Sequence, residues 1–167
     1  HPMNPATLKL VKKLNMDIIL CHSRGAYLAK PRYNNKFKKG PMEFEYSILF
    51  RKEELETLTL DEMYDRFIKY FRYNDFKWNE EKQYEYIGKE ENAIGLENIL
   101  YRCPKCDSIG KLKSSGNTLE CLECHNKIEV DSSYNIKALP GSFLPYKRID
   151  LWYKSQRKKV LEEIKNE

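Results

Sequence analysis

The sequence predicts a mixed α/β fold: a partial open α/β domain, a small inserted four-cysteine ribbon and a C-terminal helix. Three observations indicate this arrangement. Near the N-terminus, a short helical pattern precedes a nearly continuous apolar run. An alternating apolar pattern and a capped helical pattern come next. Two Cys-x-x-Cys pairs then lie between these elements and a last helical pattern.

The composition is that of a folded protein. Of the 167 residues, 41% are hydrophobic and 13% are aromatic, which is too high for a disordered chain. The net charge of +5, from 30 basic and 25 acidic residues, indicates only a mild preference for anionic partners. We find no apolar run long enough to span a bilayer and no signal-peptide pattern. We therefore expect a cytoplasmic protein.

The first predicted elements are a short helix and a buried strand. Asn4 followed by Pro5 is typical of a helix start, and apolar residues recur at helical spacing until Asn15. Residues 16–21 form a nearly continuous apolar run, which predicts a strand buried on both faces within a parallel sheet. One helix and one strand cannot cover both faces of such a sheet, so we expect a further layer upstream.

A half-buried strand and a second helix are predicted next. Residues 41–50 alternate, and one side of this strand carries Met42, Phe44, Tyr46, Ile48 and Phe50. Thr59 and Glu62 form a capping box, which predicts a helix start. The helix then places Leu60, Met63, Tyr64, Phe67, Ile68 and Phe71 on one face. We interpret this aromatic stripe as core and not as a platform for stacking bases.

The last predicted element is a basic helix at the C-terminus. One side of it carries Ile149, Trp152, Tyr153, Val160, Leu161 and Ile164. We expect this face to pack back on the main domain. The predicted divisions are residues 1–98 for the α/β part, 99–131 for the ribbon and 132–167 for the C-terminal extension and helix.

The two cysteine pairs predict a metal site. Cys103 and Cys106 form one pair, Cys121 and Cys124 form the other, and fourteen residues separate them. This separation suits a hairpin that turns at residues 114–117 and returns the second pair to the first. Four thiolates then complete a tetrahedron around one structural zinc ion, with no coordination position left for substrate. Iron binding and unmetallated thiols are the alternatives, as is replacement of Cys124 by His125.

Two further features do not favour catalysis by Cys21 or nucleic-acid binding by the ribbon. Cys21 lies in the apolar run, so we expect a small buried hydrophobe and not a nucleophile. The hairpin carries Lys111 and Lys113 against Glu120 and Glu123, with no aromatic residue on its strands. This pattern does not favour nucleic-acid binding by the ribbon.

A basic segment follows the predicted buried strand. Between Arg24 and Lys39 there are six basic residues and no acidic one. Open α/β sheets hold their ligands at the carboxyl ends of strands. Arg24, Lys30 and Arg32 are therefore candidates for binding a phosphate group, whereas the three later lysines are interpreted as a solvated loop.

Several short motifs resemble one enzyme family. The motifs are Gly25-x-Tyr27, Pro31-Arg32-Tyr33, Lys39-Gly40-Pro41, Asp75 to Trp78, Gly95 to Asn98 and Trp152 to Arg157. Together they resemble the later part of bacterial lysophospholipid acyltransferases related to 1-acyl-glycerol-3-phosphate acyltransferase, in a branch that bears a zinc ribbon. The resemblance covers nearly the whole chain.

The resemblance implies an activity whose catalytic groups are not in this sequence. In the family, a histidine deprotonates the lysolipid hydroxyl for attack on an acyl thioester, and an aspartate five positions later orients the ring. None of His1, His22 and His125 has an aspartate at that spacing, and Asp131 lies one residue too far from His125. The family's Glu-Gly-Thr-Arg phosphate motif is absent too. We therefore expect a C-terminal portion that is inactive alone.

The resemblance also implies partners. These are a lysophospholipid and an acyl thioester, with peripheral association at an anionic inner membrane face. The alternative hypotheses are a zinc-ribbon module that binds nucleic acid through residues 24–39 and an interaction domain with no ligand of its own.

Overall fold

The computed structural model describes residues 4–166 and has the predicted mixed α/β architecture, so His1 lies outside the described part. The chain divides into two compact units, and each is described by itself. The first unit is His1–Arg24 with Glu43–Asn74, and the second is Gly25–Met42 with Asp75–Glu167. This division does not follow the predicted boundaries, because residues 25–42 and 75–98 group with the cysteine segment and the last helix. No helix among residues 4–166 is long and apolar enough to cross a bilayer.

Two helices of the first unit begin where the sequence predicts, and a third, short helix between them is not predicted. Helix α1 (Pro5–Leu14) starts at Asn4, whose side chain accepts a hydrogen bond from the backbone of Ala6. Asn15 ends α1 in the left-handed conformation. The short helix α3 (Lys52–Thr57) precedes α4 (Leu60–Phe71). The Thr59–Glu62 capping box forms as predicted, with Thr59 N donating to Glu62 Oε2 at 2.8 Å.

These helices share a small hydrophobic core. Its buried members are Leu8, Leu49, Phe50, Leu55 and Met63. The apolar face of α4 packs against it through half-buried Leu60, Tyr64 and Phe67. The core interpretation of the aromatic stripe therefore holds for most of α4, but Phe71 at its end is exposed.

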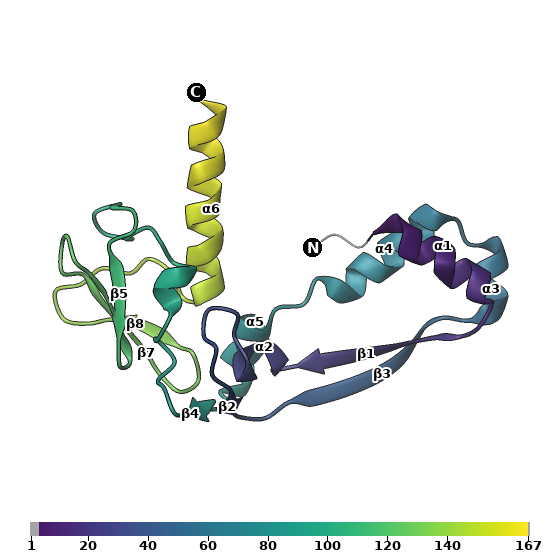
Figure 1. The fold of residues 1–167 in the computed structure, drawn as a ribbon, viewed down its shortest axis with the longest axis horizontal. Helices are drawn as coiled ribbons and strands as arrows, with labels where there is room; N and C mark the ends of the chain where they lie inside the picture. The colour runs from purple at the N-terminus through teal and green to yellow at the C-terminus, as the bar shows by residue number, and fades with distance from the viewer. Residues whose placement is uncertain (1–3, 167) are drawn as a thin grey trace. The chain divides into compact units, whose positions relative to one another are not determined.

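Strands β1 (Ile18–Arg24) and β3 (Glu43–Phe50) pair antiparallel in a two-stranded sheet (Figure 1). The prediction of a parallel sheet is therefore wrong for these strands. The prediction of a strand buried on both faces is also wrong, because Ile19 and Cys21 are exposed while Ile18 and Leu20 are half-buried. An antiparallel pair can leave one face open in this way, whereas helices cover both faces of a parallel sheet.

The open face of this sheet is apolar. The register places Ile19 opposite Ile48, Cys21 opposite Tyr46 and Ser23 opposite Phe44. We call Ile19, Cys21, Phe44, Tyr46 and Ile48 the apolar ribbon face. The predicted burial of this side of β3 is wrong, since Phe44 is 56% exposed and Tyr46 is 70% exposed, although Phe50 at the strand end is buried.

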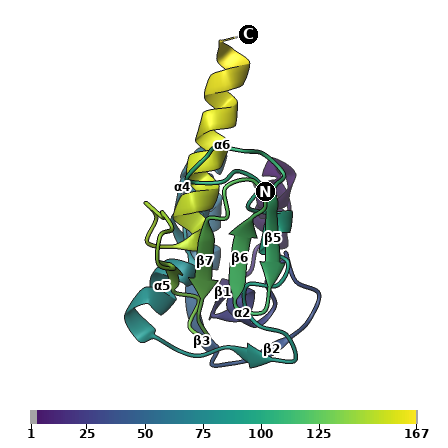
Figure 2. The ribbon, with the colours of Figure 1, turned by 90° about the vertical axis from the view of Figure 1, so that its left-hand side faces the viewer.

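The second unit is built on a four-stranded antiparallel sheet, in which Figure 2 shows β5, β6 and β7 side by side. The strands are β5 (Leu112–Ser115), β6 (Thr118–Cys121), β7 (Lys127–Val130) and β8 (Ile136–Ala138), in that order. The predicted hairpin is confirmed and turns at Gly116 and Asn117. The sheet continues through β8, beyond the predicted ribbon boundary at residue 131. A separate pair joins β2 (Lys38–Lys39) to β4 (Ile87–Gly88).

The core of the second unit collects residues from distant parts of the chain. Its helical elements are α2 (Ala26–Ala29), α5 (Asp75–Lys82), the 3-10 helix η1 (Leu96–Asn98) and α6 (Ile149–Lys165). The largest buried side chains include Tyr86, Leu96, Leu100, Leu119 and Trp152. Each lies in a different element or connection, so the sequence shows no single run that marks this core.

Helix α6 contacts this core through fewer residues than predicted. Ile149 and Trp152 are buried, as expected for the predicted face. Tyr153, Leu161 and Ile164 are exposed, so their predicted packing is wrong, whereas Val160 is half-buried. The polar Gln156 is buried instead, with its Oε1 accepting from the backbone of Tyr101 at 3.1 Å.

Candidate metal centre

Each cysteine pair sits in a tight turn, and the two turns have the same backbone pattern. In the first, Asp107 N donates to Cys103 O at 3.1 Å, and Cys103 N donates to Ser108 O at 2.9 Å. In the second, His125 N donates to Cys121 O and Cys121 N donates to Asn126 O, both at 2.9 Å. The residue after the second cysteine of each pair has a left-handed backbone conformation, with φ 63° at Asp107 and 53° at His125. The repeated turn aims both sulfurs of each pair the same way.

The hairpin brings the two turns together. Cys103 Sγ lies 3.7 Å from Cys124 Sγ, and Cys106 Sγ lies 3.7 Å from Cys121 Sγ. All four sulfurs lie within 4.8 Å of one another. A tetrahedron with zinc–sulfur bonds of about 2.3 Å requires sulfurs about 3.8 Å apart. The donor set and its spacing therefore fit one tetrahedrally coordinated ion, and the predicted grouping of four cysteines is confirmed.

His125 does not replace a cysteine in this group. Its side chain is 76% exposed, and Nδ1 lies 3.1 Å from Glu120 Oε1. His125 occupies a left-handed position of the turn, a conformation in which histidine is enriched among non-glycine residues.

Hydrogen bonds and burial divide the four thiols into two kinds. Ser108 Oγ lies 3.1 Å from Cys106 Sγ, and this contact lowers the pKa of the Cys106 thiol to about 6. Burial acts against the thiolate of Cys121, but hydrogen bonds from Ser108 and the backbone outweigh it, so the pKa of Cys121 is lowered. Burial raises the pKa of Cys103 to about 12 and raises that of Cys124. One thiol in each pair is thus readier to lose its proton.

Sequence reasoning missed the residues that support this centre. Ser108 contacts two sulfurs, since its Oγ also lies 3.3 Å from Cys121 Sγ. Arg102 is buried beside Cys103, and its guanidinium lies 3.3 Å from Asp107 Oδ2 and 2.7 Å from Glu163 Oε1 on α6. The position of Ser108 two residues after Cys106 was the available signal for the first contact. Nothing local in the sequence indicates that Arg102 and Glu163 meet.

The structure places the predicted phosphate-binding residues in different settings. Arg24 belongs to the first unit and pairs with Glu43 and Glu45 of β3. Lys30 belongs to the second unit, donates to Asn35 O and lies 4.7 Å from the centre of the Phe37 ring. Arg32 is exposed and lines a hollow of the second unit. A shared phosphate site for the three residues stays a prediction.

Two remaining sequence interpretations need correction. Cys21 is exposed on β1 and not buried as expected. The sequence predicts a solvated loop at Lys38, but this residue is buried in β2 and its ammonium donates to Glu90 O. Burial lowers the pKa of Lys38. Lys36 and Lys39 are exposed, as predicted.

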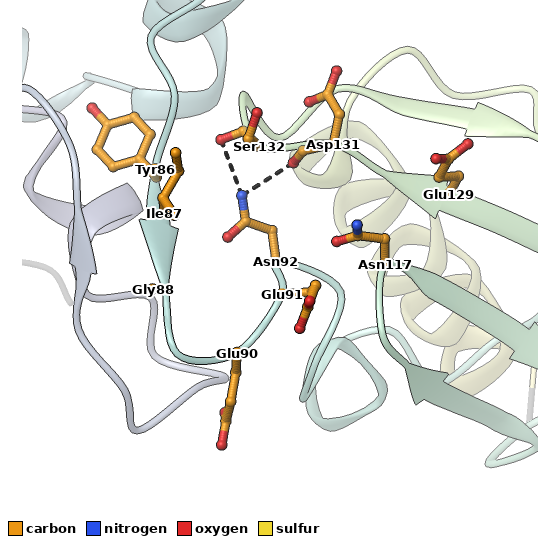
Figure 3. Close-up of a pocket in the computed structure, with 10 residues that line it drawn as sticks. All are labelled: Tyr86, Ile87, Gly88, Glu90, Glu91, Asn92, Asn117, Glu129, Asp131 and Ser132. Atoms are coloured by element: carbon orange, nitrogen blue, oxygen red, sulfur yellow. Dashed lines mark hydrogen bonds between the residues drawn. The ribbon is translucent and has the colours of Figure 1, made fainter.

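A second hollow of the second unit is acidic (Figure 3). The side chain of Asn92 fixes one wall, donating to Asp131 O at 3.1 Å and to Ser132 O at 3.0 Å. Glu90, Glu91 and Glu129 also line it. These carboxylates are ordinary surface groups, and nothing in the described part of the hollow marks a ligand position.

No protein-family model, curated protein or solved structure matches this chain.

Proposed function

We propose that the four-cysteine centre holds one zinc ion with a structural role. The two sulfur–sulfur distances of 3.7 Å match the edge of a zinc–thiolate tetrahedron. A zinc ion supplies a cross-link between the two turns when bound. Because four thiolates fill its coordination sphere, no position remains for substrate or water.

Metal analysis of the purified protein tests this proposal. We expect one zinc per chain by elemental analysis, with all four thiols protected from alkylation and exposed Cys21 the residue that reacts. Iron in place of zinc, or free reaction of all five thiols in the folded protein, would contradict it.

We also propose that the chain is the C-terminal part of a lysophospholipid acyltransferase-like protein, in which residues outside these 167 perform the acyl transfer. The contacts that the motifs of the resemblance make with one another support this proposal best. The motifs lie far apart in the sequence, yet they contact one another in the second unit. The motif residues of the resemblance therefore have structural roles within one unit.

The first contact joins the Gly25-x-Tyr27 and Asp75 to Trp78 motifs. Asp75 is buried and accepts from Gly25 N at 2.6 Å and from Tyr27 N at 2.9 Å. Gly25 has φ 80°, and an added Cβ would lie 2.6 Å from Pro41 O of the Lys39-Gly40-Pro41 motif. Three motifs therefore meet around one buried carboxylate and one glycine.

The second contact joins Pro31-Arg32-Tyr33 to Gly95 to Asn98. Asn98 Nδ2 donates to Tyr33 O at 3.2 Å, and an added Cβ at Gly95 would collide with the same carbonyl. The helix motif joins the cysteine segment in a similar way, because Trp152 Nε1 donates to Arg102 O at 3.1 Å. Gly95 and Asn98 thus meet the backbone of another motif, whereas Trp152 meets the cysteine segment.

The apolar ribbon face adds a second line of support. A contiguous exposed apolar surface of this kind marks an interface. A sheet with one bare apolar face needs another layer of structure, and an α/β acyltransferase domain would supply it. The ribbon face thus agrees with a larger assembly, whether in one polypeptide or two.

An acyl-transfer assay on two proteins tests this proposal. We expect the 167-residue chain to release no thiol from an acyl thioester above the buffer rate when a lysophospholipid is supplied. The complete gene product should be active and should contain a histidine followed five positions later by an aspartate. Absence of that pair from the gene, or activity of the isolated chain, would overturn it.

The cytoplasmic location and the peripheral membrane association belong to the same proposal. Flotation of the complete gene product with anionic vesicles, compared with neutral vesicles, tests the membrane part. Nucleic-acid binding has less support, because Arg24 is paired with two glutamates and Lys38 is buried. Tight, salt-dependent binding of an oligonucleotide would reverse this preference.

A further inference from the structure

A hollow of the second unit combines aromatic walls with a free cation. Its walls include the rings of Tyr27, Phe76 and Tyr153, together with two isoleucine side chains. Arg32 and Asp150 supply its charged groups. The volume is about 350 Å³, at the small end of the range of about 300 to 1,000 Å³ for ligand pockets.

Two of the aromatic walls are held in place by the core. The rings of Tyr27 and Phe76 lie 5.8 Å apart in an edge-to-face arrangement. Phe76 also contacts the buried Tyr134, with ring centres 5.9 Å apart. Burial raises the pKa of the Tyr27 hydroxyl. Rings held edge to face, here at 70°, offer both a face and an edge to a further planar ring.

Arg32 is positioned for binding an anion. Its side chain is exposed, and within residues 4–166 no carboxylate pairs with it, although its charge also acts on the Tyr27 hydroxyl. Its neighbours Pro31 and Tyr33 are both buried. The backbone at Arg32 is therefore fixed, while the guanidinium remains available to hold a phosphate or carboxylate with two hydrogen bonds.

The carboxylate of Asp150 does not cancel this cation. Arg148 Nε lies 2.9 Å from Asp150 Oδ1, and Lys154 Nζ lies 3.5 Å from Asp150 Oδ2. Arg148 is shared with Glu80. Asp150 is thus already paired with two cations from outside the lining, and Arg32 is the cation that the lining itself presents.

We propose that this hollow binds a small aromatic anion, with its planar ring against the aromatic side chains and its phosphate or carboxylate on Arg32. A nucleotide and a simple aryl phosphate share this chemistry. The inference depends on the second unit alone and not on the proposed acyltransferase role, so either can fail without the other.

Titration of the metal-loaded chain with four probes tests the ligand class. The probes are phenyl phosphate, adenosine monophosphate, octyl phosphate and inorganic phosphate, followed by amide chemical shifts. We expect at least one aromatic probe to bind about tenfold more tightly than inorganic and octyl phosphate, with shifts at the hollow. The tighter of the two aromatic probes identifies a nucleotide or an aryl source. Equal binding of octyl phosphate, or shifts located elsewhere, overturns the proposal.

Two variants and a matched control test the residues. Arg32→Gln should weaken the aromatic probe about tenfold, and Tyr153→Ser should weaken it severalfold. Arg157→Gln, at an exposed arginine of α6 outside the lining, should leave binding unchanged. All three side chains are exposed, so we expect folded proteins with unchanged thermal unfolding. An equal effect of Arg32→Gln and Arg157→Gln would show general charge attraction and refute the assigned site.

Discussion

The two units of the chain differ in the size of their hydrophobic cores and in what accompanies each core. The second unit joins a four-stranded sheet, distant loops and α6 into one core beside a four-cysteine centre. The first unit has a core of a few side chains under three helices and exposes the apolar ribbon face. Small domains bury too little surface for ample stability, and a metal is one remedy while an interface is another. On the proposed function, a bound metal would stabilise the second unit, whereas a covering surface would bury the exposed apolar face of the first.

Loss of the metal should have the largest effect, and only on the second unit. Cys121→Ser removes a fully buried ligand, and we expect a loss of more than ~5 kcal/mol in the free energy of unfolding of that unit. Hydrogen exchange across the full chain measures the two units separately. Cys21→Ser, at an exposed cysteine, is the control and should change neither unit. Equal loss of protection in both units would show that they do not differ as described.

A cavity in the core of the first unit should reverse this pattern. Met63 is fully buried, so Met63→Ala should lower the free energy of unfolding of the first unit by about 3 kcal/mol. Protection of the second unit should stay the same. The matched control is Met16→Ala, at a methionine that is 52% exposed. A large effect of the control variant would be inconsistent with the described core.

The capping box of α4 should give the first unit a pH-dependent contribution. The backbone N–H of Thr59 donates to Glu62 and lowers the pKa of that carboxyl. The stabilisation is therefore present above the unfolded-state pKa of about 4.3 and is lost as the pH falls through the lower folded-state pKa. Urea unfolding of the first unit should show Glu62→Gln as destabilising at pH 7 and nearly neutral at low pH. Glu56→Gln serves as control. If Glu62→Gln lowered the free energy of unfolding equally at every pH, the prediction would be contradicted.

Charged substitutions on the apolar ribbon face should have the smallest effect on stability. Tyr46→Lys places its charge in solvent, so we expect a change of less than about 0.5 kcal/mol. Because an exposed apolar patch promotes association, this variant should also self-associate less in sedimentation experiments. Ser47→Lys, on the opposite face of β3, provides the comparison. If Tyr46→Lys unfolds the first unit, that face is covered and the contrast between the units fails.

Local signals predicted the elements that depend on near neighbours. The capping box at Thr59, the helix start at Asn4 and the hairpin between the cysteine pairs each involve residues a few positions apart. The same is true of the four cysteines, because the tight turns and the hairpin that group them are short-range. Spacing alone was therefore enough for the candidate metal centre.

Burial and long-range pairing were decided by the tertiary structure. The apolar alternation in β3 indicated a buried face, but which face is covered depends on elements elsewhere in the chain. The Asp75 carboxylate and the Gly25 backbone are fifty residues apart, and the sequence does not show that they meet. Spacing in the chain thus determines turns, caps and metal ligands, whereas the packing of distant segments decides which apolar residues are buried and which polar groups are paired.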